Sequence, residues 1–216
     1  MKIAAKKPVK RRVPFGDQLS VEELVGLTAE MQDLRSHPPL TKRSDGKYEG
    51  DILGFVKGLR LSARLVYFLR NVLSATTLHV SWGHLIVNNE SCSPECDIII
   101  HKPGHIRKWN GNHAPVMDFT FVEANAALAV ISCKSNLTAI DKQYPKVLQK
   151  HGVEKVFLFA ECCQEKHLAK LRERAQAAGY GGLWCLYLLQ DGSLPFKTGG
   201  DMYIDFAKAI KKAVTS

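Results

Sequence analysis

The sequence lacks any apolar run that approaches the roughly 18 residues of a membrane-spanning helix. Its basic N-terminus is not followed by the apolar core of a signal peptide. It also contains neither the glycine-rich phosphate loop of nucleotide hydrolases nor a dinucleotide-binding fingerprint. These absences argue against a membrane protein, a secreted protein and both of those nucleotide-binding classes. We therefore expect a cytoplasmic protein that has no membrane partner.

No zinc-binding pattern connects the six cysteines, because their spacing matches no common ligand set. Most of them lie in or beside apolar segments that are typical of strands: Cys96, Cys133, Cys162 and Cys185. Cysteine in such a setting usually behaves as a small buried hydrophobe. We expect reduced thiols and no disulfide framework, in keeping with a cytoplasmic location.

Acidic residues are scarce, since 21 Asp and Glu stand against 30 Lys and Arg and give a net charge of +9. This excess favours an acidic partner, nucleic acid first, and we expect DNA rather than RNA. Much of the excess is local, because six cations lie within the first twelve residues: Lys2, Lys6, Lys7, Lys10, Arg11 and Arg12. The alternative interpretation is a basic arm on a nearly neutral domain. Lys10, Arg11 and Arg12 are the candidates for nucleic-acid contact in this arm.

Composition and periodicity divide the chain into three parts. Residues 1–15 have no apolar periodicity and predict a basic flexible arm. Residues 16–49 predict an N-terminal helix, opened by a capping box of Ser20 and Glu23, and then an exposed loop. Residues 50–216 are long enough for one domain.

Helical and extended patterns alternate through this domain. We predict helices at 51–73, 138–151, 164–178 and 201–214, and strands at 76–88, 93–100, 128–133, 153–160 and 183–189. The order is a helix, three strands in a meander, and then alternating helices and strands. Such an order is typical of a mixed sheet flanked by helices, so the predicted fold class is α/β.

One side of the helix at 51–73 is basic. Lys57, Arg60 and Arg64 recur at three- and four-residue spacing and therefore project from the same side. These cations form either a solvated face or a stripe that contacts the phosphates of a nucleic acid.

An insertion at 101–118 follows the second predicted strand. Its residues Arg107, Lys108 and Trp109 are candidates for contacting the backbone and a base of a nucleic acid. The insertion also contains the histidines His101, His105 and His113. Their spacing matches no metal site, so we expect solvated loop histidines.

Two apolar, β-branched strands each carry one charged residue. The first lies in Ser-Pro-Glu-Cys-Asp-Ile-Ile-Ile and begins near Asp97. The second lies in Ala-Val-Ile-Ser-Cys-Lys-Ser and ends at Lys134. A charge on a buried strand is costly unless it is paired or binds a metal. We therefore expect Asp97 and Lys134 to meet.

At these residues the sequence resembles the PD-(D/E)XK nuclease superfamily, over roughly residues 50 to 190. The resemblance implies a restriction-endonuclease-like fold, in which helices flank a mixed central sheet. It also implies a metal-dependent endonuclease that uses Mg²⁺ or Mn²⁺, with Asp97, Ser132 and Lys134 at the catalytic positions. Ser132 departs from the family pattern, because a neutral hydroxyl stands where a metal-binding carboxylate is expected.

The resemblance further implies that Asp97 and the carbonyl oxygen of Cys133 would hold the metal. A single carboxylate is a poor ligand set for Mg²⁺, so another acidic residue is needed. Glu123 is our candidate for the vacant position, with Glu95 and Asp118 as alternatives. Without a metal, we expect Lys134 to pair with Asp97 as an ordinary buried ion pair, and no cofactor is then required.

Three functional hypotheses remain open at this point. The chain is a metal-dependent endonuclease acting on DNA, or a catalytically inactive relative that binds nucleic acid. The third hypothesis is a protein-interaction module, for instance a factor in bacterial or phage defence or counter-defence. A homodimer or a protein partner is compatible with each of them.

Overall fold

The structure is a computed structural model, and it describes residues 50–87, 91–104, 106–108, 119–190, 196–197 and 201–215. The arm predicted at 1–15 and the helix and loop predicted at 16–49 lie outside the described residues. Among the helices that the structure describes, none is long and apolar enough to cross a membrane.

The described strands form one mixed sheet of nine strands, in the order β4-β5-β1-β3-β6-β7-β8-β9, with β2 paired to β1. Their bounds are β1 (His79–Val87), β2 (Ser91–Cys92), β3 (Cys96–His101), β4 (Ile106–Lys108), β5 (Phe119–Glu123), β6 (Ala127–Leu137), β7 (Val156–Gln164), β8 (Leu183–Leu189) and β9 (Phe196–Lys197). Strands β1, β3 and β6 form an antiparallel meander, whereas β6, β7 and β8 run parallel. The meander therefore joins the parallel part of the sheet at β6.

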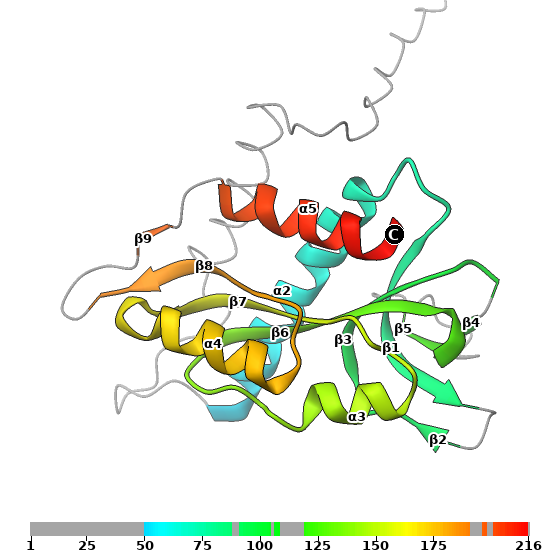
Figure 1. The fold of residues 1–216 in the computed structure, drawn as a ribbon, viewed down its shortest axis with the longest axis horizontal. Helices are drawn as coiled ribbons and strands as arrows, with labels where there is room; N and C mark the ends of the chain where they lie inside the picture. The colour runs from blue at the N-terminus through cyan, green and yellow to red at the C-terminus, as the bar shows by residue number, and fades with distance from the viewer. Residues whose placement is uncertain are drawn as a thin grey trace, which may run out of the picture.

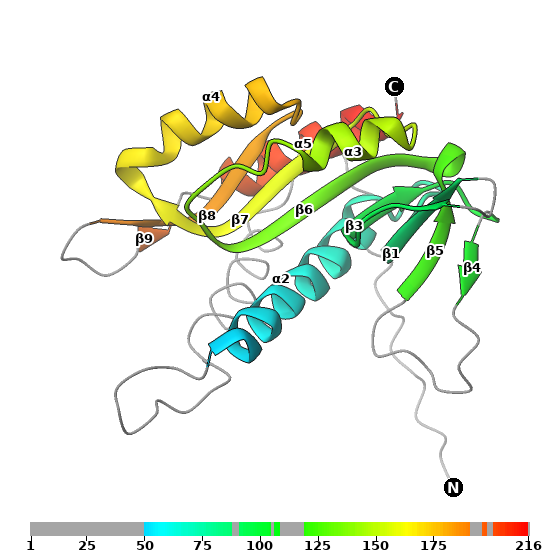
Figure 2. The ribbon, with the colours of Figure 1, turned by 90° about the horizontal axis from the view of Figure 1, so that it is seen from below.

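Helices cover both faces of this sheet (Figure 1). Their bounds are α2 (Gly50–Val72), α3 (Tyr144–Lys150), α4 (Leu168–Ala178) and α5 (Asp201–Thr215), with short 3₁₀ turns η1 (Ala124–Ala126) and η2 (Glu165–His167). The apolar residues of α2 and α5 pack into one core, and those of α3 and α4 pack into a second core. Figure 2 shows α2 running obliquely past β6. The predicted α/β class, a mixed sheet between helices, is confirmed.

Most predicted elements occur, with shifted ends. The helix predicted at 51–73 is α2, and the one predicted at 201–214 is α5. The strand predicted at 128–133 is longer, because β6 continues to Leu137 while it stays paired with β7.

The prediction of a helix at 138–151 is wrong over its first half, since α3 begins only at Tyr144. Pro145 lies in the first turn of α3, where a residue without a backbone N–H is tolerated. The Asp141 carboxylate accepts hydrogen bonds from the backbone N–H groups of Gln143 (2.9 Å) and Tyr144 (3.2 Å). These bonds satisfy donors that a longer helix would have used internally.

Strand β5 was not predicted as a separate strand, and it pairs parallel to β1. This pairing depends on Gly83, which lies opposite Thr120 with a positive φ of 150°. A Cβ atom at Gly83 would lie 1.8 Å from the Thr120 carbonyl oxygen. Only glycine permits this close approach of the two backbones.

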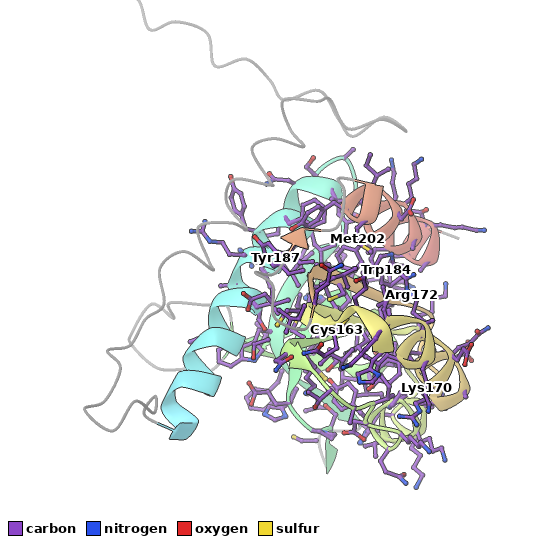
Figure 3. The ribbon with its side chains drawn as sticks, turned by 90° about the vertical axis from the view of Figure 1, so that its left-hand side faces the viewer. Cys163, Lys170, Arg172, Trp184, Tyr187 and Met202 are labelled. Carbon is purple, nitrogen blue, oxygen red and sulfur yellow. The ribbon has the colours of Figure 1, made fainter. Side chains whose placement is uncertain are left out.

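The open edge of β8 is protected by side chains from both flanking helices. In the described part of the chain, β9 pairs with Tyr187 and Leu188 of β8. The guanidinium of Arg172, on α4, donates to the carbonyl oxygen of Leu183 (3.4 Å) and to the sulfur of Met202 on α5 (3.8 Å). Figure 3 shows Arg172, Trp184 and Met202 close together at this edge. Such caps limit pairing of an exposed edge strand with another chain.

A chain of buried hydrogen bonds links β5, β1 and β3. Thr120, Ser81 and His101 are 2%, 4% and 0% exposed. The Thr120 hydroxyl donates to the Ser81 hydroxyl (2.9 Å), and Ser81 lies 3.0 Å from Nε2 of His101. Nδ1 of His101 donates to the Lys102 carbonyl (2.8 Å), so Nε2 carries no proton and accepts from Ser81.

The prediction of a solvated loop histidine is therefore wrong for His101, which is a buried, neutral member of the sheet. His105 and His113 lie outside the described residues. Burial lowers the pKa of His101 first of all, and the nearby His79 lowers it further, against the opposing effect of the hydrogen bond to Lys102.

We predict that this network makes the fold acid-sensitive. Below about pH 6.5 the unfolded histidine binds a proton while the folded one still excludes it, so stability falls as the pH falls toward the folded pKa. The loss contributed by His101 should not exceed about 1.4 kcal/mol per pH unit. Urea unfolding between pH 8 and pH 5 measures it, and the slope should flatten in His101→Gln. An equal slope in both proteins would contradict the prediction.

Candidate functional site

The two charged strands lie side by side, as expected from the sequence. Strand β3 pairs with β6 from Ile98–Ile131 to His101–Ala127, so Asp97 lies opposite Ser132 just beyond the last pair. The Asp97 carboxylate oxygen Oδ2 accepts the backbone N–H of Cys133 at 2.7 Å. The Ser132 hydroxyl lies 3.5 Å from the same oxygen. Beyond the last β3–β6 backbone pair, the Asp97 carboxylate is therefore the hydrogen-bond acceptor for the backbone of β6.

Burial is the main influence on the ionisation of Asp97. It raises the pKa of this carboxyl above its ordinary value, and the charge of Glu95 raises it further. The Cys133 N–H, the Lys134 ammonium and the Ser132 hydroxyl oppose that effect in decreasing order. The largest single support for the ionised form is thus a backbone hydrogen bond rather than a charge.

The Lys134 ammonium attracts the Asp97 carboxylate from the protein surface. Its side chain is exposed, whereas Ser132 is 3% and Cys133 is 6% exposed. The expectation of a buried Asp97–Lys134 ion pair therefore does not hold, although the two residues are neighbours and attract each other. An exposed ammonium is screened by water and contributes little to stability.

Three aromatic residues that the sequence analysis did not select donate hydrogen bonds to the segments around Asp97. The Tyr144 hydroxyl donates to the Glu95 carbonyl oxygen (3.2 Å), and the Trp82 indole N–H donates to the Glu95 carboxylate (2.7 Å). Tyr180 donates to the Asp141 carbonyl (3.2 Å) and so ties the β6–α3 loop to the end of α4. Burial, and then the charges of Cys96 and Asp97, raise the pKa of Tyr144. No motif marks these residues, because they meet only when α3 packs on the sheet.

Of the candidate replacement ligands, the two that the structure describes, Glu123 and Glu95, are not placed beside Ser132 to complete a site at Asp97. Glu123 lies on β5 opposite Ile86, and β1 separates β5 from β3 in the sheet. The Glu95 carboxylate is held by Trp82. Asp118 lies outside the described residues.

The described residues at Asp97 do not fit Mg²⁺ or Mn²⁺. They contain no group of three or more His, Cys, Asp or Glu side chains placed to hold a metal ion. Ser132 offers a neutral oxygen, and burial raises the pKa of the Cys133 thiol well above its ordinary value. Magnesium requires several hard oxygen ligands, of which the described part of the site supplies one carboxylate.

The structure describes only some of the residues that we proposed for nucleic-acid contact. Arg64 lies half-buried on α2, while the side chains of Lys57 and Arg60 fall outside the described part of that helix. Arg107 and Lys108 lie on β4, opposite Phe121 and Thr120, and their side chains are likewise outside the description. Lys10, Arg11 and Arg12 lie outside the described residues. Contact of these residues with nucleic acid stays a prediction.

Comparison with known proteins identifies the fold. No protein-family model matches the chain, and no curated protein matches it. Solved structures do match: cAAA-bound NucC from P. aeruginosa ATCC27853 has a TM-score of 0.56 at 11% identity and covers 92% of each chain. The chain has the restriction-endonuclease-like fold.

NucC from E. coli MS115-1 gives the same result in two forms. The apo form has a TM-score of 0.54 at 10% identity and covers 92% of this chain and 93% of that chain. The cAAA-bound form has a TM-score of 0.56 at 11% identity and covers 92% of each. At such low identity, likeness to NucC concerns the fold alone. The restriction-endonuclease-like fold agrees with the resemblance seen in the sequence, in which Asp97 and Lys134 lie on neighbouring strands.

We predict that Asp97 is a structural acceptor rather than a ligand held ready for a metal. Asp97→Ala should cost about 1–3 kcal/mol, because it leaves the buried Cys133 N–H without a partner. Asp97→Asn keeps an acceptor oxygen and removes the charge that burial disfavours, so it should be as stable as the wild type or more stable near pH 7. Lys134→Ala should cost less than about 1 kcal/mol because Lys134 is exposed. Urea unfolding measures all three, and equal losses in the two Asp97 variants would contradict the prediction.

Proposed function

We propose that this protein binds nucleic acid through a restriction-endonuclease-like domain that has lost metal-dependent cleavage. The observation that carries the proposal is the state of Asp97. Its carboxylate accepts the Cys133 N–H at 2.7 Å and faces the Ser132 hydroxyl instead of a second carboxylate. Hydrolysis in the PD-(D/E)XK family depends on ions that polarise the phosphate and activate water, and the residues that the structure describes here supply too few ligands for them.

The charge of the chain supports nucleic acid as the partner. A net charge of +9, much of it within residues 1–12, attracts a polyanion, and DNA is the form we propose first. Two of the similar NucC structures are bound to cAAA, so proteins with this fold can bind that ligand. A role in phage defence or counter-defence, a homodimer and a protein partner all stay predictions.

We predict that wild-type protein neither cleaves DNA nor responds to metal. Adding millimolar Mn²⁺ should leave its melting temperature unchanged, since a ligand stabilises a protein only by binding the folded state. Ser132→Glu places a carboxylate opposite Asp97 and should create a Mn²⁺-dependent rise in melting temperature. Ser132→Gln matches its size without the charge and should show no such rise, and neither should Ser132→Glu combined with Asp97→Asn.

Nuclease assays on supercoiled plasmid provide the opposite test. Robust cleavage by the wild type with Mg²⁺ or Mn²⁺, abolished by Asp97→Asn, would show that a ligand outside the described residues completes the site. The chain would then be an active endonuclease.

We also predict that nucleic-acid binding is strongly salt-dependent and relies on residues 1–15. Each phosphate neutralised on duplex DNA contributes about 0.9 to the slope of log affinity against log salt. Deleting residues 1–15 should weaken binding and flatten this slope while the melting temperature stays the same. Fluorescence anisotropy with duplex DNA and duplex RNA of one sequence measures the slope and the preference. An unchanged slope would place the contacts elsewhere, with Lys57, Arg60 and Arg64 as the next candidates.

A further inference from the structure

Tyr67 on α2 is the exposed large hydrophobic side chain of the described residues, with 46% of its surface accessible. Its apolar neighbours on the same helix are buried in the core: Leu65 is 0%, Phe68 is 4% and Leu69 is 0% exposed. Packing therefore does not explain an aromatic residue at position 67. A single exposed aromatic residue is common on protein surfaces, so its meaning depends on the residues that share its face of the helix.

Tyr67 shares one face of α2 with the basic positions of that helix. At 100° per residue, positions 57, 60, 64, 67 and 71 fall within an arc of about 80°. They carry Lys57, Arg60, Arg64, Tyr67 and Asn71, which we call the α2 stripe. No Asp or Glu occurs between Lys57 and Asn71. The α2 stripe thus joins an exposed aromatic ring to an unbroken run of cationic positions.

The helix that carries Tyr67 is held firmly against the sheet. Nε and Nη2 of Arg70 donate to the Val80 carbonyl oxygen at 3.1 Å and 2.9 Å, which ties the end of α2 to β1. Phe68 stacks on Phe206 of α5 with ring centroids 6.2 Å apart. Because the backbone beneath it is fixed, binding of a flat ligand has to order only the side chain of Tyr67.

We propose that the α2 stripe binds single-stranded nucleic acid, with Tyr67 stacking on an unpaired base and the basic positions contacting the phosphates. The inference rests on the proposed function and deepens it, because it names the strand state of the ligand. An aromatic ring on a helix surface reaches the face of a base only when that base is not stacked within a duplex. The rise from Lys57 to Arg64 is about 10 Å, which matches roughly three nucleotides of a stacked strand.

The uniform charge of the α2 stripe favours this ligand over a protein. A protein partner would have to bring a matching set of carboxylates, whereas every nucleotide brings a phosphate. Stacking also tolerates any base, so no base-reading residue is required beside Tyr67. Docking of a second copy of the chain, or of another protein, becomes an outcome of the test.

The experiment compares the affinities of the full chain for a fluorescent single strand and for the duplex of the same sequence. Tyr67→Ala should weaken single-strand binding about 5- to 150-fold, which is the loss of one base stack, and leave duplex binding unchanged. Tyr67→Phe keeps the ring and should bind like the wild type. Tyr67→Leu keeps apolar area without a ring and should behave like Tyr67→Ala. Position 67 is exposed, so equal melting temperatures are expected for all variants.

The salt dependence separates the two parts of the α2 stripe. Arg64→Gln should reduce the single-strand salt slope by about 0.7, because one phosphate contact is lost. Tyr67→Ala should lower the affinity at every salt concentration without changing the slope. Arg174→Gln, which removes an exposed arginine of α4 on the other face of the sheet, is the matched control and should change neither.

The outcomes distinguish this inference from the proposed function. Single-strand binding by Tyr67→Ala or Tyr67→Leu at wild-type strength would overturn the inference, and salt-dependent duplex binding would still support the proposed function. Loss of a dimer in sedimentation by Tyr67→Ala, with single-strand affinity unchanged, would also overturn it and assign the surface to a second copy. No binding of either probe by the wild type would overturn both.

Discussion

The hydrogen bond from the Cys133 N–H to the Asp97 carboxylate ties the candidate site to the fold itself. It lies where the β3–β6 ladder ends, and it satisfies a backbone donor that would otherwise lose its partner. Cys133 is 6% exposed and packs in the same core as α2 and α5. A carboxylate at this position therefore serves the sheet whether or not a metal is present. The Ser132 hydroxyl, opposite Asp97, lies 3.5 Å from the same carboxylate oxygen.

Strand β3 is anchored by a polar group at each end. Asp97 accepts from β6 at its start, and His101 accepts from Ser81 of β1 at its end. Between them Ile98, Ile99 and Ile100 are 0% exposed, so they contribute apolar contacts to both cores. Polar groups at such sites set the register of a strand that apolar packing alone would leave free to slip. The two ends differ in exposure, which leaves only the Asp97 end within reach of solvent and ligand.

Predictions from the sequence were correct where the residue types of a single segment decide the outcome. The two motif strands were predicted to be neighbours, and Asp97 on β3 does lie beside β6, although its partner is the Cys133 N–H and not Lys134. Such predictions were wrong where the outcome depends on contacts between several segments. Helix α3 begins at Tyr144, whose backbone N–H donates to the Asp141 carboxylate, and β5 forms because Gly83 lets Thr120 approach. Lys134 and His101 were assigned the wrong burial, because exposure depends on what packs over a strand end. Glu123 lies in a strand like the motif residues, but only the sheet order shows that β1 separates it from Asp97.

The sequence by itself determined the α/β class, the pairing of the two motif strands, the basic character of the chain and the absence of a carboxylate at Ser132. These depend on residue type and on periodicities of two or 3.6 residues, which are local properties. Tertiary structure alone decided the partner of the Asp97 carboxylate, the aromatic residues around Glu95, the buried path from Thr120 to His101 and the exposure of Tyr67. Each of these is a contact, or the lack of one, between segments far apart in the chain. No local pattern specifies such contacts, because they follow from how the strands and helices pack.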